Sequence, residues 1–363
     1  MKSFIVGVGQ CGGKLATKLI DRSAKRSKHS VTGAFAVNTA RADLDPLPID
    51  KYLIGQDIVR GGGVGGDNEH AVEIMERDLD EVMREVADNI GIETEAIIVT
   101  AGLGGGTGSG GAPVLAGALR DDYEIPVYAI GVLPSNTESA LRTRNAGRSL
   151  TSLQKNADAT LIVDNNTWGD EDESLAGWYD TINTEIADQF TLLFNAGEVR
   201  DESGESVVDT SEVINTLDVG GTAAIGYGET VVELDDEDEY THNIKVTTRE
   251  ALSTGLSVSG DVTAETGLVV VAGDPKRISR EGIEKAQQIL EDELDSFRIR
   301  GGDLPLPGSD KIQVIVLLGG LQESTRIDSL LEDAADIIET QQLNESDDES
   351  ENYFENDDID GLL

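Results

Sequence analysis

Three glycine-rich segments provide the clearest chemistry in the sequence. The run Gly102–Gly111 contains seven glycines in ten residues and follows a short apolar segment, Ala96–Thr100. Because glycine has no Cβ, successive backbone N–H groups in such a loop can converge on an anion. A helix predicted to begin near Pro113 would add the positive end of its dipole. The run therefore predicts a cradle for a polyphosphate, and since it contains no lysine it is not a Walker loop.

The segments Gly7–Gly12 and Gly61–Asn68 are two further glycine loops. The first has the G-x-G-x-x-G spacing of a dinucleotide fold. A Rossmann enzyme normally places an acid after the second strand to hold a ribose, whereas here Val37 is followed by the uncharged Asn38. The sequence therefore disfavours an NAD-dependent oxidoreductase. Flexible linkers would account for one such loop, but poorly for three at strand ends.

Short β-branched segments, which alternate with helical patterns, must position these loops. The predicted strands are Ser3–Val8, Ala34–Val37, Ala96–Thr100, Val127–Leu133 and Thr160–Val163. Such alternation is typical of a doubly wound α/β sheet whose strands are buried on both faces. We therefore predict a Rossmann-like nucleotide-binding domain over residues 1–173.

The rest of the chain divides into three further parts. Residues 174–199 carry an apolar stripe at helical spacing, and a helix of about 22 residues would span roughly 33 Å, enough to join two domains. Residues 200–341 alternate strands and helices and predict a smaller α+β domain. No basic residue follows Arg326, and residues 342–363 are too acidic to pack. We expect this last part to be a disordered acidic tail.

The net charge is −42, because 70 acidic residues face 28 basic ones. Such a surface repels phosphate backbones and anionic lipid headgroups, which argues against a nucleic-acid partner. Molar salt shortens the Debye length to roughly 3 Å and removes most of the self-repulsion, so the composition fits a host that accumulates salt.

Other sequence features exclude several classes of site. Cys11 is the only cysteine, so an intramolecular disulfide and a cysteine-based metal site are excluded, and the three histidines have no metal-ligand spacing. We therefore expect no metal site built from protein ligands. No apolar run is long enough for a transmembrane segment and no cleavable signal precedes the first strand, so the expected location is cytoplasmic.

The order of these motifs resembles that of a known superfamily. The segment Gly104–Gly110 (GGGTGSG), preceded by Gly9–Gly13 (GQCGG), is similar to the tubulin signature of the tubulin/FtsZ superfamily. Within the superfamily, the GQCGG loop, the compact length and the halophilic composition resemble the haloarchaeal CetZ group. The resemblance implies GTP or GDP as the ligand and a GTPase domain joined by a central helix to a C-terminal activation domain.

The resemblance also implies roles for individual residues. Residues implied in phosphate and loop contacts are Gly9, Gln10, Cys11, Gly12, Gly13, Asn38, Gly65, Gly105, Gly106, Thr107 and Gly108. At the nucleoside end, Glu138 and Arg142 would contact the sugar, and Asn165 and Asn183 the base. An amide offers one acceptor and two donors, which match guanine O6, N1–H and N2–H.

An acidic pair past the central helix is the predicted catalytic element. In the superfamily, a loop of the adjacent subunit supplies acids that position the attacking water, and Asp209 and Glu212 have the corresponding separation. Val207 stands where the family usually has Asn. Two carboxylates near a γ-phosphate can orient and deprotonate water, with Mg²⁺ held mainly by phosphates and water. The alternative is that these are two surface acids of a very acidic protein.

The resulting functional prediction is a GTP-hydrolysing cytoskeletal protein that polymerises head to tail. The resemblance implies a role in cell shape or motility, in the cytoplasm and near the cell envelope. A monomeric nucleotide-dependent switch is the alternative, since it needs only the pocket. The tail contains Tyr353, Phe354 and the apolar end Ile359–Leu363, so we expect that it docks on an adaptor.

Overall fold

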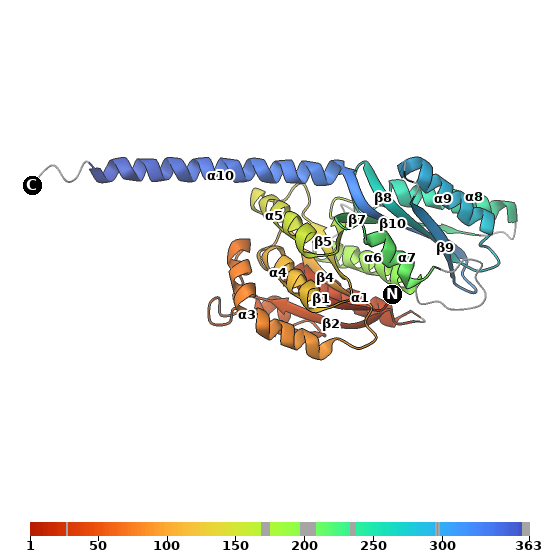
Figure 1. Cartoon of the computed structure of the whole chain (residues 1–363), viewed down its shortest axis with the longest axis horizontal. Coiled ribbons are helices and arrows are strands. Elements are labelled where there is room, and N and C mark those ends of the chain that lie inside the picture. Colours follow the sequence, from red (N-terminus) through yellow and green to blue (C-terminus); the bar gives the residue numbers. More distant parts are fainter. Residues whose placement is uncertain are drawn as a thin grey trace, which may run out of the picture.

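The computed structural model describes residues 1–26, 28–167, 175–196, 208–232, 237–294, 296 and 298–357. Its strands form one ten-stranded sheet in the order β3-β2-β1-β4-β5-β6-β7-β10-β8-β9, with helices packed on both faces (Figure 1). The connections on either side of the central helix lie outside the described residues, as does Val207. The boundaries predicted at 173 and 199 therefore stay predictions.

The amino-terminal half of the sheet is parallel. Its strands are β1 (Ser3–Val8), β2 (Val31–Asn38), β3 (Asp50–Leu53), β4 (Ala96–Gly102), β5 (Val127–Leu133) and β6 (Ala159–Asp164). Five of them were predicted, and the doubly wound arrangement is confirmed. The strand β3 was not predicted, because it has only four residues, lies at the sheet edge and begins with two exposed charged side chains, Asp50 and Lys51.

The helices between these strands begin at the glycine loops. They are α1 (Gly9–Ala24), α2 (Arg41–Leu44), α3 (Asn68–Asn89), α4 (Gly106–Asp122) and α5 (Ala140–Asn156). The prediction that α4 starts near Pro113 was wrong, since the helix begins seven residues earlier. Intrinsic propensity disfavours glycine in a helix. Here tertiary packing overrides it, because a Cβ on Gly110 would lie 2.2 Å from the carbonyl oxygen of Asn68.

The central helix, α6 (Leu175–Ala196), packs beside α1. Lys18 and Arg22 of α1 form ion pairs with Asp180 and Asp188 of α6, at 2.8 and 2.5 Å. The α-amino group of Met1 donates a hydrogen bond to the carbonyl oxygen of Phe194, at 2.6 Å. The two helices thus run side by side along one face of the parallel sheet.

The carboxyl-terminal half continues the same sheet. Its elements are α7 (Thr210–Leu217), β7 (Thr222–Val231), α8 (Glu237–Ser253), β8 (Val262–Gly273), α9 (Arg280–Leu294), β9 (Ile299–Pro305), β10 (Lys311–Ser324) and α10 (Thr325–Asp357). The strand β7 pairs in parallel with β6, and β10 pairs antiparallel with both β7 and β8. The predicted second α+β unit is therefore present, and its strands extend the first sheet instead of forming a separate one.

The last helix, α10, runs for 33 residues and projects beyond the body of the molecule (Figure 1). Its first turns pack closely on α5, where a Cβ on Gly147 would lie 2.4 Å from the Cβ of Ala334. Residues 342–357, predicted to be a disordered tail, continue this helix, because a nucleated helix extends at little cost and no glycine or proline interrupts the segment. Residues 358–363 lie outside the described part.

None of the helices in the described ranges combines the length and the apolar composition that a membrane span needs.

Candidate functional site

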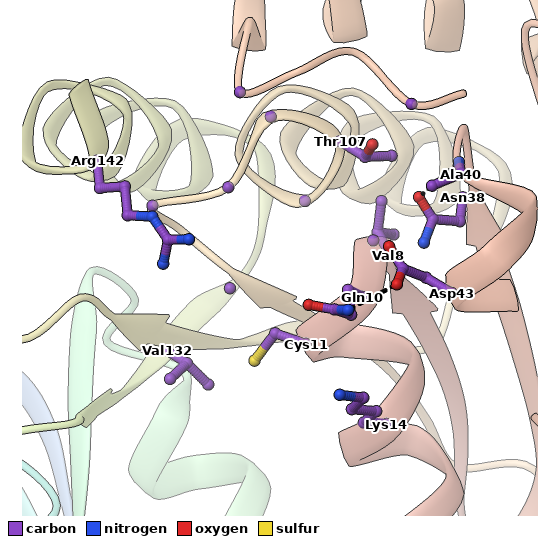
Figure 2. Close-up of a pocket in the computed structure, with 18 of the residues that line it drawn as sticks. Val8, Gln10, Cys11, Lys14, Asn38, Ala40, Asp43, Thr107, Val132 and Arg142 are labelled. Carbon is purple, nitrogen blue, oxygen red and sulfur yellow. Dashed lines mark hydrogen bonds between the residues drawn. The ribbon is translucent and has the colours of Figure 1, made fainter. Parts of the chain in front are cut away.

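A cavity of about 400 Å³ opens at the carboxyl ends of the parallel strands. Val8 ends β1, Asn38 ends β2 and Gly102 ends β4, and all three line it, together with Val132 of β5. Its volume falls within the range of about 300–1,000 Å³ that is typical of ligand pockets. Open parallel sheets bind their ligands at this edge. Figure 2 shows the lining side chains facing the space between α1, α4 and α5.

The glycines make one wall of the cavity from backbone. Gly9 has φ +74°, and a Cβ there would lie 2.8 Å from the amide nitrogen of Gly108. A Cβ on Gly108 would lie 2.8 Å from the carbonyl oxygen of Gly102. The loops at the starts of α1 and α4 therefore touch, and residues at both helix N-termini line the cavity. Such a pair of N-termini is an anion site.

The buried side chain of Asn145 holds two glycine loops together. Its Nδ2 donates to the carbonyl oxygens of Gly66 and Gly104, at 2.8 and 3.3 Å. A second link joins the hydroxyls of Thr39 and Thr107, at 2.7 Å. Asn145 was not predicted from the sequence, since nothing in the spacing of a helical Asn indicates which loops it contacts.

Polar side chains form the opposite wall. Glu138 accepts a hydrogen bond from the backbone N–H of Ser135 at 3.0 Å and pairs with Arg142, which points into the cavity (Figure 2). The buried amides Asn165 and Asn183 also line it, one from the end of β6 and one from α6. Residues far apart in the chain thus provide acceptors and donors at one end of the cavity.

Most of the predicted binding residues lie together in this cavity. Those that line it are Gly9, Gln10, Cys11, Asn38, Gly65, Gly105, Gly106, Thr107, Gly108, Glu138, Arg142, Asn165 and Asn183. Gly12 and Gly13 do not. A Cβ on Gly12 would lie 2.0 Å from the carbonyl oxygen of Thr100, and one on Gly13 would lie 2.7 Å from Leu47 Cδ1. These two glycines are needed for close packing of α1 on its neighbours.

Two charged residues of the cavity were not assigned individual roles from the sequence. Lys14 lies one helical turn beyond Gln10 on α1, and Asp43 accepts a hydrogen bond from Gln10 Nε2 at 2.6 Å (Figure 2). The i, i+4 spacing of Gln10 and Lys14 on one helix face was the signal that could have found the lysine. Other lining residues not named individually from the sequence are Val8, Ala40, Gly62, Gly63, Val64, Gly66, Gly102, Gly104, Val132, Pro134 and Ile182.

The single cysteine is a neutral part of the wall. Burial raises the pKa of the Cys11 thiol to about 11, against the opposing effect of Lys14, while Glu138 adds to the rise. The thiol therefore stays protonated at neutral pH and places no negative charge beside a bound anion.

The acidic pair stands at the start of α7. Asp209 caps the helix, since its Oδ1 accepts from the backbone N–H of Glu212 at 3.1 Å. The hydrogen bond from the Ser211 hydroxyl lowers the pKa of Asp209. Burial raises the pKa of Glu212, and the Asp209 charge adds to the rise, while Arg300 opposes it. The pair thus combines a carboxylate that stays ionised with one that binds a proton more readily.

This pair lies at the opposite edge of the sheet from the cavity. The hydroxyl of Thr210 donates to Glu95 Oε2 at 3.3 Å, and Glu95 directly precedes β4, whereas Gly102 at the other end of β4 lines the cavity. Seven residues of extended strand span roughly 23 Å. The cavity and the acidic pair of one chain are therefore separated by the length of the sheet.

The described residues contain no group of three or more His, Cys, Asp or Glu that could hold a metal ion. Asp43 is a carboxylate in the cavity wall beside the glycine loops. This donor set fits Mg²⁺, which usually keeps several waters and binds one or two carboxylates together with substrate phosphates.

Two family models cover almost all of the chain. Residues 2–171 match the GTPase domain of the tubulin/FtsZ family, and residues 172–336 match the C-terminal domain of tubulin-like CetZ. The chain is 47% identical to the tubulin-like protein CetZ2 of Haloferax volcanii over 363 residues, which is the full length of both. It is 34% identical to CetZ of Pyrococcus abyssi, with 91% of this chain and 88% of that protein covered.

Solved structures agree with these matches. CetZ2 from Haloferax volcanii, a GTPγS-bound protofilament, superposes with a TM-score of 0.90 at 46% identity, over 94% of this chain and 100% of that one. CetZ1 from the same organism, a GDP-bound monomer, gives 0.85 at 40% identity, again over 94% and 100%. The predicted fold and superfamily are thus confirmed, and the chain belongs to the tubulin-like CetZ family of FtsZ-type cytoskeletal GTPases.

Proposed function

We propose that this chain polymerises head to tail and that Asp209 and Glu212 of one subunit complete the GTP site of the next. The observation that carries the proposal is the separation of cavity and acidic pair to opposite edges of one sheet. A second copy stacked along the strand direction would bring its acidic edge to the first copy's open cavity. The protofilament form of the related CetZ2 supports this arrangement.

In the proposed complex, GTP lies across the cavity. Its phosphates face the backbone N–H groups at the starts of α1 and α4, and the guanine faces Asn165 and Asn183. Glu138 accepts from the ribose hydroxyls, and Arg142 holds Glu138 in place. Backbone donors fixed by Asn145 and by glycine packing need no rearrangement when the phosphate charge develops, which is the condition for electrostatic stabilisation of a transition state.

The acids of the adjacent subunit act on water. Glu212, with its raised pKa, accepts the proton of the attacking water, and the ionised Asp209 orients that water through a hydrogen bond. A base with a pKa closer to the working pH is the better proton acceptor. Bound Mg²⁺ offsets phosphate charge, and Asp43 is the residue that would hold it through water.

The test mixes two inactive variants. Gly108→Ala displaces the glycine wall and binds GTP weakly but keeps the acidic pair, whereas Glu212→Gln keeps the cavity but lacks the proton acceptor. Alone, each should hydrolyse GTP slowly. Mixed in molar KCl, they should recover activity, because a junction can then pair an intact cavity with an intact acidic pair. No recovery, together with wild-type activity per molecule that is constant on dilution, would instead indicate the alternative, a monomeric GTP-dependent switch.

We further propose a cytoplasmic filament that acts in cell shape or motility near the cell envelope. An adaptor would bind the acidic end of the chain, at 342–363. Truncation after Leu343 should leave GTP binding and assembly unchanged and alter the position of filaments in cells. Unchanged positions would remove the adaptor from the proposal.

A further inference from the structure

A buried ion pair joins the carboxyl-terminal half of the chain to the nucleoside end of the cavity. Arg326, in the first turn of α10, donates from Nε to Asp164 Oδ2 at 3.2 Å. The Arg326 side chain is 7% exposed and that of Asp164 is 0% exposed. The two residues are separated by 162 positions in sequence. A buried pair of this kind requires that all remaining donors and acceptors be satisfied.

Both oxygens of Asp164 are fully engaged. Oδ2 also accepts from the Ser259 hydroxyl at 2.6 Å. Oδ1 accepts from the backbone N–H and from Nδ2 of Asn166, at 3.2 and 2.8 Å. Asp164 is the last residue of β6, so these hydrogen bonds fix the loop at the point where it leaves the strand, one residue before Asn165. Asn165 is one of the two amides that line the cavity.

The same arginine fixes a second loop. Arg326 Nη2 donates to the carbonyl oxygen of Pro134 at 2.6 Å, and Pro134 begins the segment that carries Glu138. The two loops are also joined directly, because Asn136 and Asn166 exchange hydrogen bonds of 3.1 and 3.3 Å. One guanidinium therefore sets the spacing between the loop that bears Asn165 and the loop that bears Glu138.

We propose that Arg326 is a positioning residue that determines nucleoside recognition from outside the cavity. The proposal rests on the proposed GTP site and deepens it. Among the described residues, Arg326 donates hydrogen bonds to Asp164 and to one residue of the cavity lining, Pro134, and neither Arg326 nor Asp164 lines the cavity. The phosphate wall is held by different contacts, those of Asn145 and of the packed glycines. Loss of Arg326 should therefore weaken recognition of base and sugar and leave recognition of phosphate intact.

The experiment compares two probes on the full-length protein in molar KCl. GTP uses both ends of the cavity, whereas inorganic tripolyphosphate uses only the glycine wall. For Arg326→Gln, GTP affinity should fall by up to about a hundredfold, the size of effect that a misplaced binding group produces. Tripolyphosphate affinity should stay within about twofold, and the preference for GTP over ATP should narrow, since Asn165 loses its fixed position.

Further variants separate positioning from folding. Arg326→Lys keeps the charge but replaces a planar fork with a single ammonium, so it should give an intermediate loss of GTP affinity. If Arg326→Gln does not fold, the double variant Asp164→Asn, Arg326→Gln removes the unpaired buried charge. In that variant, too, affinity for GTP should fall more than affinity for tripolyphosphate. Arg277→Gln is the matched control, because Arg277 donates to the carbonyl oxygens of Val232 and Ser309, away from the cavity.

Two results would overturn the proposal. One is an unchanged affinity for GTP in Arg326→Gln. The other is an equal weakening for both probes, which would mean that Arg326 only supports the fold. If wild-type protein itself shows no preference for GTP over ATP, the proposed GTP site fails, and this inference with it.

Discussion

The two ends of the parallel strands, called here the carboxyl edge and the amino edge of the sheet, differ in how they are built. At the carboxyl edge, backbone N–H groups and close-packed glycines form a cavity with few titratable side chains, so its geometry depends on the absence of Cβ atoms. At the amino edge, the chemistry lies in two carboxylates at one helix start, and their geometry depends on ordinary capping. In the proposed mechanism, the first edge binds GTP and the second provides the proton acceptor for the next subunit. The helices α1 and α6 run between them.

The largest expected effect comes from the amino edge. Glu212→Gln should lower GTP hydrolysis by about 10²–10⁴-fold, the contribution of a positioned general base, and leave GTP binding unchanged. Steady-state hydrolysis in molar KCl with parallel binding measurements would show this split. Glu93→Gln is the control, since Glu93 is a partly exposed acid at the same edge that pairs with Lys2. A loss of binding in Glu212→Gln would contradict the division between the two edges.

At the carboxyl edge, a single added methyl group should weaken the binding of GTP. In Gly108→Ala, the new Cβ meets backbone on two sides, 2.8 Å from the carbonyl oxygen of Gly102 and 3.1 Å from that of Val8. Backbone cannot yield as a side-chain end does, so the glycine wall must shift, and a binding group displaced in this way lowers GTP affinity by up to about a hundredfold. Fluorescent-nucleotide titration would measure it. Gly91→Ala should bind normally, because its Cβ would approach nothing closer than 3.9 Å. Wild-type affinity in Gly108→Ala would mean that the nucleotide lies elsewhere.

The pH dependence of the two edges should also differ. If Glu212 is the proton acceptor, only its ionised form is active, so the rate of hydrolysis should fall as the pH drops through its raised pKa, at a higher pH than an ordinary glutamate would give. Arg300 opposes the rise. In Arg300→Gln the pKa of Glu212 should therefore increase further and move the acid limb to higher pH. Rate–pH profiles measured with saturating GTP would show the shift, whereas GTP binding should not follow it. A limb that does not move would remove Glu212 as the proton acceptor.

The smallest effect is expected from the ion pairs between α1 and α6, the helices that run from one edge to the other. Arg22 and Asp188 are each about one-third exposed, and exposed pairs contribute about 0.2–1 kcal/mol. Arg22→Gln should lower the Tm slightly at reduced salt and not measurably in molar KCl, where screening is strongest. Lys25→Gln is a control, since Lys25, the residue that caps the carboxyl end of α1, pairs with Asp21 of the same helix and not with α6. A large loss of Tm at high salt would show that α1 and α6 depend on this pair for more than charge.

The sequence predicted the carboxyl edge better than the contacts that support it. The glycine loops and the strands before them are local patterns, so their positions could be found without a structure. Lys14 was not predicted because it lies one residue beyond the glycine motif that ends at Gly13. Gly12 was assigned to the ligand because a glycine needed for packing looks the same in sequence as one needed for binding.

Contacts between distant segments could not be predicted at all. Arg326 and Asp164 are separated by 162 positions, and no sequence pattern links one to the other. The start of α4 at Gly106 was also missed, since glycine propensity argues against a helix and only the approach of Asn68 explains it. Disorder was also predicted for residues 342–357, which continue α10, because an acidic composition does not show that a helix packed on α5 extends into them.

The long helix α10 has a consequence for how neighbouring filaments can approach one another. Its 33 residues extend for about 50 Å, and no basic residue follows Arg326. In a filament, every subunit would carry such a rod, and together the rods would form a charged fringe. At reduced salt the fringes would repel, whereas in molar salt the repulsion would reach only a few ångströms and the length of the rods alone would set the gap. The helix would then act as a spacer that keeps filaments single or at a fixed lateral distance.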